Sequence, residues 1–362
     1  MPPFDSFSGR AGFHGRWRAG AALCLGLFLT WRAVAASVGL DVLPGEDEQG
    51  PVTVFYPSTD QATALRRGPF TLNVAWQGAP MPGNQRLVVI SHGSGGSPWP
   101  QSDLAAALVQ AGFVVAMPEH RGDNARDHRR VGPPSWKIRP LEVSEAIDRL
   151  GSAPRFAGLF DAQQVGVYGM SAGGLTALTL AGARWSPARF ARHCDEHGEE
   201  DAVDCTGGMV HRDGWDGLKL ALSRWYVDLR YGRDEDWQSH TDPRIVAVVA
   251  AVPMAAPIDL ESIRQPALAH PPALGLIEAR RDEWLVPRFH IDPVREACGT
   301  RCELLADLPD GGHGAVLSPW SDDIARREDR FLMDPPGFRR ETEVPAVYAR
   351  IVDFFQRHLL AP

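Results

Sequence analysis

Apolar residues change their spacing repeatedly along this chain, and the alternation restricts the fold to few architectures. Two early strands are predicted at residues 52–56 and 70–76. Six short segments, rich in β-branched residues and mostly apolar on both faces, predict further strands at residues 87–90, 113–117, 165–168, 245–252, 274–277 and 303–306. Helices are predicted at residues 103–111, 141–150, 174–183 and 346–359. Strands buried on both faces belong to parallel sheets, so a doubly wound α/β sandwich is expected.

Residues 184–240 interrupt this alternation. The segment is polar, acid-rich and aromatic, and it contains one predicted helix at residues 218–226. A structureless stretch of that length is unusual in a compact domain, and α/β proteins bind ligands at the carboxyl edge of the sheet. We therefore expect an inserted cap that covers this edge, with a remote surface elaboration as the alternative.

The first 35 residues have the pattern of a secretory signal. Three arginines precede a short apolar stretch at residues 19–31, and small residues at 33–35 form a cleavage pattern before Ala36. Thirteen apolar residues are too few to span a bilayer comfortably. The pattern predicts a cleaved signal at 1–35, a catalytic domain at 36–362 and a periplasmic or secreted protein, with an uncleaved anchor as the alternative.

Composition and charge argue against two broad classes. With 44% hydrophobic and 23% charged residues, the chain can bury a large core, which argues against a disordered or fibrous protein. The net charge is −8, and loss of residues 1–35 would change it to −11. Because the basic residues are scattered among acids, we do not expect a nucleic-acid partner.

Four cysteines follow the predicted signal, in two pairs that are close in sequence. Four cysteines can pair in three ways, and pairing Cys194 with Cys205 and Cys298 with Cys302 closes the shortest loops. Disulfides are expected in an exported chain, because they persist in oxidising compartments. A metal site is the alternative around the first pair. Its residues would be His193, Cys194, Asp195, Glu196, His197, Cys205 and His211. Their spacing matches no zinc pattern, so the disulfide is favoured and no metal is predicted.

A serine between two glycines follows the strand predicted at 165–168. Residues 168–174 (YGMSAGG) carry the G-x-S-x-G pattern of a nucleophile elbow in its strand–turn–helix context. So tight a turn leaves no room for side chains at Gly169 and Gly173, and it holds the intervening serine in a strained conformation with its hydroxyl over the sheet. Ser171 is therefore the predicted nucleophile.

Two glycine-rich turns supply the other predicted groups. Residues 91–96 (SHGSGG) follow the strand at 87–90. Acyl transfer develops negative charge on the carbonyl oxygen, which backbone N–H groups of such a turn can stabilise. The predicted donors are the N–H groups of Ser94 and Ala172, and His92 is expected to brace the turn. His313 lies in a glycine-bounded loop after the last core strand and follows Ser171 in the chain, as a general base of this kind does.

The chain resembles the α/β-hydrolase superfamily, and more closely the exported dienelactone-hydrolase-like group related to platelet-activating-factor acetylhydrolases. The residues that carry the resemblance are 91–96, 118–124 (PEHRGDN), 139–143 (RPLEV), 169–174 (GMSAGG) and 310–314 (DGGHG). The resemblance covers about residues 38–360 and implies the fold and serine ester hydrolysis by a triad. Met170 departs from the histidine often found before the nucleophile, and dienelactone hydrolases proper use a cysteine where this chain has Ser171.

The triad acid is expected after a strand that follows the elbow. Asp282 is favoured because its loop, with Trp284 and Leu285 beside it, resembles that of the related exported hydrolases. Glu283 is the second candidate, and Asp259 is the third.

The expected activity is that of an exported serine hydrolase acting on small-molecule or lipid carboxylic esters through an acyl-enzyme, without a metal or organic cofactor. An amidase or peptidase on the same fold is the first alternative, and a non-catalytic binding module is the second. No stable membrane anchor is expected after cleavage of the signal.

Overall fold

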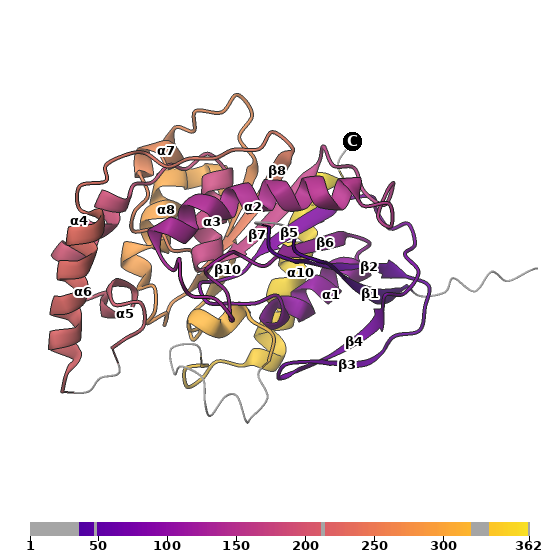
Figure 1. The fold of residues 1–362 in the computed structure, drawn as a ribbon, viewed down its shortest axis with the longest axis horizontal. Helices are drawn as coiled ribbons and strands as arrows, with labels where there is room; N and C mark the ends of the chain where they lie inside the picture. Colours follow the sequence, from indigo (N-terminus) through magenta and orange to yellow (C-terminus); the bar gives the residue numbers. More distant parts are fainter. Residues whose placement is uncertain (1–35, 47–48, 211–213, 320–332, 361–362) are drawn as a thin grey trace, which may run out of the picture. The chain divides into compact units, whose positions relative to one another are not determined.

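A ten-stranded sheet forms the centre of the unit that begins at Ala36 (Figure 1). The computed structural model describes residues 36–46, 49–210, 214–319 and 333–360, so the predicted signal lies outside the described residues. The strands are β1 (Ser37–Leu43), β2 (Val52–Ser58), β3 (Thr63–Arg67), β4 (Phe70–Trp76), β5 (Leu87–Ser91), β6 (Val114–Pro118), β7 (Val165–Met170), β8 (Ile245–Ala251), β9 (Ala273–Ala279) and β10 (Cys302–Leu308).

The strand order explains where a site can form. From one edge the order is β10-β9-β8-β7-β5-β6-β2-β1-β4-β3, and the run from β10 to β6 is entirely parallel. Strands β2 and β1 continue the sheet with antiparallel pairing. The carboxyl ends of β5, β7, β8, β9 and β10 therefore lie along one edge, where the loops that follow them meet. This is the predicted α/β-hydrolase architecture.

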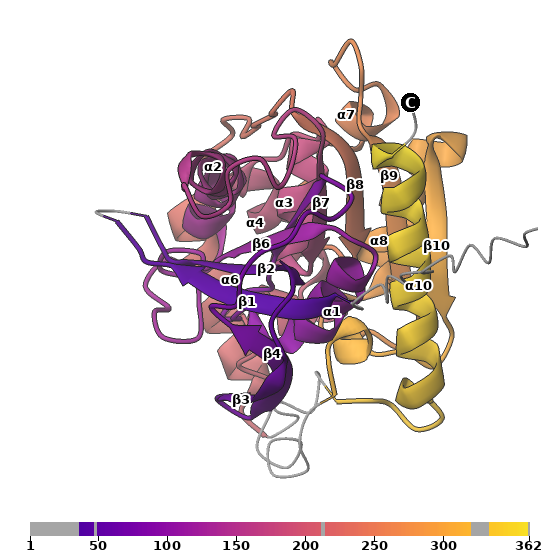
Figure 2. The same ribbon diagram turned by 90° about the vertical axis from the view of Figure 1, so that its right-hand side faces the viewer.

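Helices cover both faces of the sheet and divide the core in two. One core cluster includes buried residues of α2 (Pro133–Ser152), α3 (Ala172–Leu180) and α8 (Ile291–Cys298). The other includes residues of α1 (Ser102–Gln110) and α10 (Arg340–Leu359), which lie on the opposite face (Figure 2). Since β5 and β7 are buried along their whole length, their apolar composition reflects burial on both faces.

The expected insertion contains three helices in place of the one predicted. They are α4 (Pro187–His197), α5 (Ala202–Cys205) and α6 (Asp216–Tyr231), after which the chain returns to β8. Trp185 and Gln238 exchange backbone hydrogen bonds of 3.1 and 2.7 Å, which joins the two ends of the segment. We call residues 184–240 the cap.

Each of the eight predicted strands, and each of the four helices predicted outside the cap, is present in the structure, although some begin or end at other residues. The largest difference is α2, which starts at Pro133 rather than at residue 141. Sequence patterning missed β1 and β3, and also α7 (Leu260–Arg264). No residue of β3 is buried, so this strand lacks the apolar pattern that identified the others.

Candidate active site

Ser171 occupies a strained turn between β7 and α3. Its φ is +59° and its ψ is −121°, a conformation that residues other than glycine rarely adopt. Hydrogen bonds hold the turn on both sides, because the Ser171 N–H donates to Ala251 O at 3.1 Å and its carbonyl accepts from Met254 N at 3.0 Å. The strain is therefore maintained by the neighbouring β8 and the residues after it.

The two glycines of the turn have a steric function. A Cβ on Gly169 would lie 1.8 Å from Gly173 O, and a Cβ on Gly173 would lie 2.0 Å from Ser91 O. Both contacts are with backbone, which cannot move aside. The strand, the helix and the turn after β5 can pack this closely only because these positions carry no side chain.

The turn after β5 passes next to Ser171. A Cβ on Gly93 would lie 3.4 Å from Ser171 Cβ, and Ser94 lines the same cavities as Ser171. Within the described part of the chain, the backbone N–H groups of Ser94 and Ala172 have no hydrogen-bond partner, so both donors are available to a substrate oxygen.

His313 and Asp282 form a buried hydrogen-bonded pair. His313 follows β10 and Asp282 follows β9, and their side chains are 3% and 2% exposed. His313 Nδ1 lies 2.7 Å from Asp282 Oδ2, and the other carboxylate oxygen accepts from the N–H groups of Trp284 and Leu285 at 2.8 Å each. The Trp284 ring stacks on His313 with its centroid at 5.7 Å. This contact was missed, because stacking across a loop leaves no pattern in the sequence.

The other two candidate acids lie in different surroundings. Glu283 is exposed, although it directly follows Asp282. Asp259 forms an ion pair with Arg184 at 2.7 Å and caps the start of α7 by accepting from Glu261 N. Of the three carboxylates, Asp282 is the one in hydrogen-bond contact with His313.

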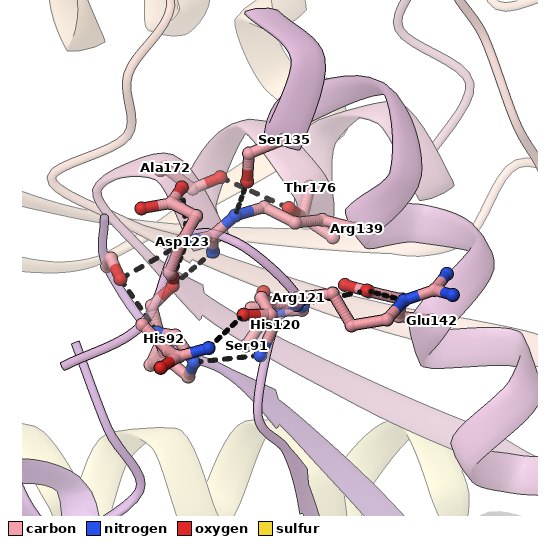
Figure 3. A network of polar contacts seen from close by, with 12 residues as sticks. Ser91, His92, His120, Arg121, Asp123, Ser135, Arg139, Glu142, Ala172 and Thr176 are labelled. Carbon is pink, nitrogen blue, oxygen red and sulfur yellow. Dashed lines mark hydrogen bonds and ion pairs between the residues drawn. The ribbon is translucent and has the colours of Figure 1, made fainter. Parts of the chain in front are cut away.

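A buried ion pair fixes the turn after β5 (Figure 3). Asp123 Oδ1 accepts from Ser94 Oγ at 2.7 Å and from Gly95 N at 2.8 Å, while its other oxygen lies 2.8 Å from Arg139 Nη2. Arg139 also donates to His92 O at 2.6 Å. Burial raises the pKa of the Asp123 carboxyl. Arg139 and the hydrogen bonds lower this pKa by more than burial raises it, so it lies well below its ordinary value. The carboxylate stays charged and holds the turn.

A second set of contacts ties the same turn to α2 (Figure 3). His120 lies 2.8 Å from Ser91 Oγ through Nε2 and 2.7 Å from Glu142 Oε2 through Nδ1. His92 Nε2 accepts from the His120 N–H at 3.2 Å, and His92 Nδ1 lies 2.7 Å from Gly93 O. Burial lowers the pKa of both histidines, so they are neutral hydrogen-bonding groups of the turn.

These two networks give a structural role to two of the motifs that carry the family resemblance. Asp123 and His120 belong to residues 118–124, and Arg139 and Glu142 belong to residues 139–143. Polar residues that end up fully buried, such as Arg139, need partners. Their proximity to the turn after β5 depends on the tertiary fold.

Two cavities meet at Ser171. The larger, about 750 Å³, extends toward the cap and is lined by apolar side chains including Trp136, Phe190, Leu222 and Tyr226. The smaller, about 320 Å³, is lined by His313, Phe70, Trp99 and Leu317. Ser94 and Trp284 contribute to both walls.

The cap supplies one wall of the larger cavity, although some of its aromatic residues point elsewhere. Tyr226 and Tyr231 line the cavity, whereas Trp185 is buried in the core and Trp225 is 64% exposed. A disulfide joins Cys194 in α4 to Cys205 in α5, and a second joins Cys298 to Cys302, which is the local pairing that the sequence favoured.

Comparison with known proteins adds one structural similarity. No family model and no curated protein sequence matches the chain. Among solved structures, the chain is similar to a ferulic acid esterase from Streptomyces cinnamoneus, with 16% sequence identity, a TM-score of 0.49 and 91% of each chain covered. Within the described residues, we find no helix with the length and apolar character needed to span a bilayer.

Proposed function

We propose that this chain is an exported serine hydrolase that cleaves carboxylic esters through an acyl-enzyme intermediate. The observation that carries the proposal is the meeting of three groups at one sheet edge. Ser171 sits in a strained elbow, His313 lines the same cavity, and Asp282 lies 2.7 Å from His313 Nδ1. The two disulfides support export, because such bonds persist in oxidising compartments.

Each residue has one role in the proposed reaction. Ser171 Oγ attacks the ester carbonyl carbon while His313 Nε2 accepts the hydroxyl proton, and the Ser94 and Ala172 N–H groups bind the oxygen that becomes negative. Collapse of the tetrahedral intermediate breaks the bond to the alcohol, which takes the proton from His313. Water then attacks the acyl-enzyme by the same route and releases the acid. Asp282 holds the histidine proton on Nδ1, which leaves Nε2 free to accept.

The two cavities are proposed to bind different parts of the ester. The leaving alcohol must lie beside the histidine that protonates it, and His313 lines the smaller cavity. The acyl group then occupies the larger, apolar cavity beneath the cap. Replacing Tyr226 by Ala should extend activity to longer acyl chains, whereas Trp99→Ala should alter selectivity for the alcohol.

A fluorophosphonate probe tests the nucleophile directly. Wild type should be labelled, and Ser171→Ala should not. Ser223→Ala is the matched control, because this serine lines the same larger cavity and its hydroxyl makes no hydrogen bond within the described structure. Labelling that persists in Ser171→Ala would refute the assignment.

A substrate panel separates the alternative functions. Nitrophenyl esters from acetyl to palmitoyl report esterase activity, and matched nitroanilides report amidase activity. Faster hydrolysis of the anilides would favour the amidase alternative. An unlabelled protein that hydrolyses neither series would favour a binding module.

A further inference from the structure

A second cluster of chemically active side chains lies between the cap and the loop that carries Asp282. It comprises His193 from α4, Asp201 just before α5, Asp204 within α5, and His290 just before α8. One ligand atom from each residue lies within 4.8 Å of the others. All four side chains are at least nine-tenths buried, with exposures of 8, 0, 8 and 1% respectively.

Hydrogen bonds satisfy only some of the polar atoms in this cluster. Asp201 Oδ2 lies 2.8 Å from His193 Nε2 and 2.8 Å from His290 Nε2, and Asp201 Oδ1 accepts from Val286 N at 3.3 Å. Asp204 Oδ2 has no hydrogen-bond partner within the described structure, although it lies 3.8 Å from His290 Nε2. A buried carboxylate oxygen without a donor is costly, and a second carboxylate nearby increases the cost.

The environment of His290 shows which atoms remain for a ligand. His290 Nδ1 accepts from the Ala255 N–H at 3.0 Å, so the neutral ring carries its proton on Nε2. That proton is donated to Asp201 Oδ2. His290 is thus an outer partner that orients a carboxylate, which is the usual arrangement around a metal-bound carboxylate. His193 also contacts Asp201 Oδ2 through Nε2, but no backbone N–H of the described residues fixes the proton of its ring on that atom, so Nε2 can exchange this hydrogen bond for an ion. The imidazole of His193 and the two carboxylates are therefore the candidate ligands.

We propose that His193, Asp201 and Asp204 bind a divalent transition-metal ion, for which Zn²⁺ is the best match. One imidazole nitrogen with two carboxylate oxygens is a ligand set that zinc accepts, whereas Ca²⁺ and Mg²⁺ prefer oxygen ligands alone. Two buried carboxylates together carry the charge that a divalent ion neutralises. This set differs from the metal alternative considered from sequence, whose two cysteines form the Cys194–Cys205 disulfide.

The location gives the ion a structural role beside the proposed active site. Cys194 and Cys205 directly follow His193 and Asp204 in the chain, so their disulfide holds two of the ligands near each other. Asp201 accepts from Val286, in the loop that begins at Asp282. Asp204 and Cys205 also line the larger cavity. A bound ion would therefore hold three cap residues together, and one of them, Asp201, is hydrogen-bonded to the loop of the proposed triad acid.

Metal analysis and thermal unfolding of the full protein test the site without relying on esterase activity. After purification without chelators, elemental analysis should find about one zinc ion per chain. Removal with a chelator should lower the Tm, and ZnCl₂ but not CaCl₂ should restore it. A protein that contains no zinc and whose Tm is unchanged by ZnCl₂ would overturn the proposal, because a proton on Asp204 would then account for the cluster.

Variants assign the ligands. Asp204→Asn should reduce zinc affinity by about a hundredfold or more and remove the zinc-dependent rise in Tm, whereas His290→Gln should weaken affinity by about tenfold to a hundredfold. The matched control is Asp195→Asn, because Asp195 also lies in the cap but is 75% exposed. Zinc binding by Asp204→Asn as tight as that of wild type would refute the assignment. If that variant fails to fold, the wild-type titration still decides.

Discussion

Replacing Asp282 by Asn tests whether this carboxylate controls the proton of His313. The side chain uses both oxygens, one for the N–H groups of Trp284 and Leu285 and the other for His313 Nδ1. Asparagine has only one oxygen. If it stays with the two backbone donors, the amide NH₂ faces His313, so that Nδ1 must accept and Nε2 carries the proton. A histidine in that tautomer cannot deprotonate Ser171.

The structure permits an estimate of the loss. Turning the asparagine so that its oxygen faces His313 breaks two backbone hydrogen bonds, at a cost of roughly 2–3 kcal/mol. The neutral amide also loses the charge-assisted bond that stabilises the imidazolium, worth about 1.5–3 kcal/mol more. Together these effects, about 3.5–6 kcal/mol, correspond to a reduction in kcat of roughly 400- to 25,000-fold.

The assay is kcat for nitrophenyl acetate, with circular dichroism to verify the fold. Glu283→Gln is the matched control, because it changes the adjacent, exposed carboxylate by the same chemistry. We expect near-wild-type kcat for the control. If Asp282→Asn retains wild-type kcat while Glu283→Gln loses it, the reasoning from the hydrogen bonds is wrong and another acid orients His313.

Three further predictions concern stability. Replacing Cys194 and Cys205 together by Ser opens a link between residues 11 apart and should lower the free energy of unfolding by about 3 kcal/mol in urea titrations; an unchanged midpoint would contradict this. Arg139→Met leaves Asp123 charged and buried without its partner, so we expect the free energy of unfolding to fall by about 3–5 kcal/mol and kcat to fall by more than KM changes. A wild-type free energy of unfolding together with a wild-type kcat would refute the role of Arg139 in holding the turn. Burial raises the pKa of Glu142, but its histidine and arginine partners lower it to about 2, below its ordinary value of 4.5. Because the pKa of Glu142 is lower in the folded state, its charged form contributes stability above pH 4.5, and this contribution is lost as the pH falls toward 2. In Glu142→Gln the free energy of unfolding should therefore decrease less steeply between pH 4.5 and 2 than in wild type, and an equal slope would contradict the assignment.

Sequence alone determined the features that depend on short-range chemistry. The apolar, β-branched strands are recognisable because burial on both faces imposes one residue type over several positions. Ser171 is recognisable because its turn requires glycines at fixed offsets, as the close backbone contacts of Gly169 and Gly173 show. The loop of His313 follows from chain order and flanking glycines. Each of these signals lies within a few neighbouring residues.

The tertiary structure decided what depends on direction and on contacts between distant segments. Asp282 and Glu283 are adjacent carboxylates, and only the path of the loop directs one toward His313 and the other toward solvent. The cluster joining His193 to His290 spans nearly a hundred residues, so no local spacing could indicate it. Likewise, the partners of Arg139 become its neighbours only when α2 packs beside the sheet. Local residue preferences specify strands and turns, whereas the direction in which an individual side chain points follows from the packing of the whole sheet and its helices.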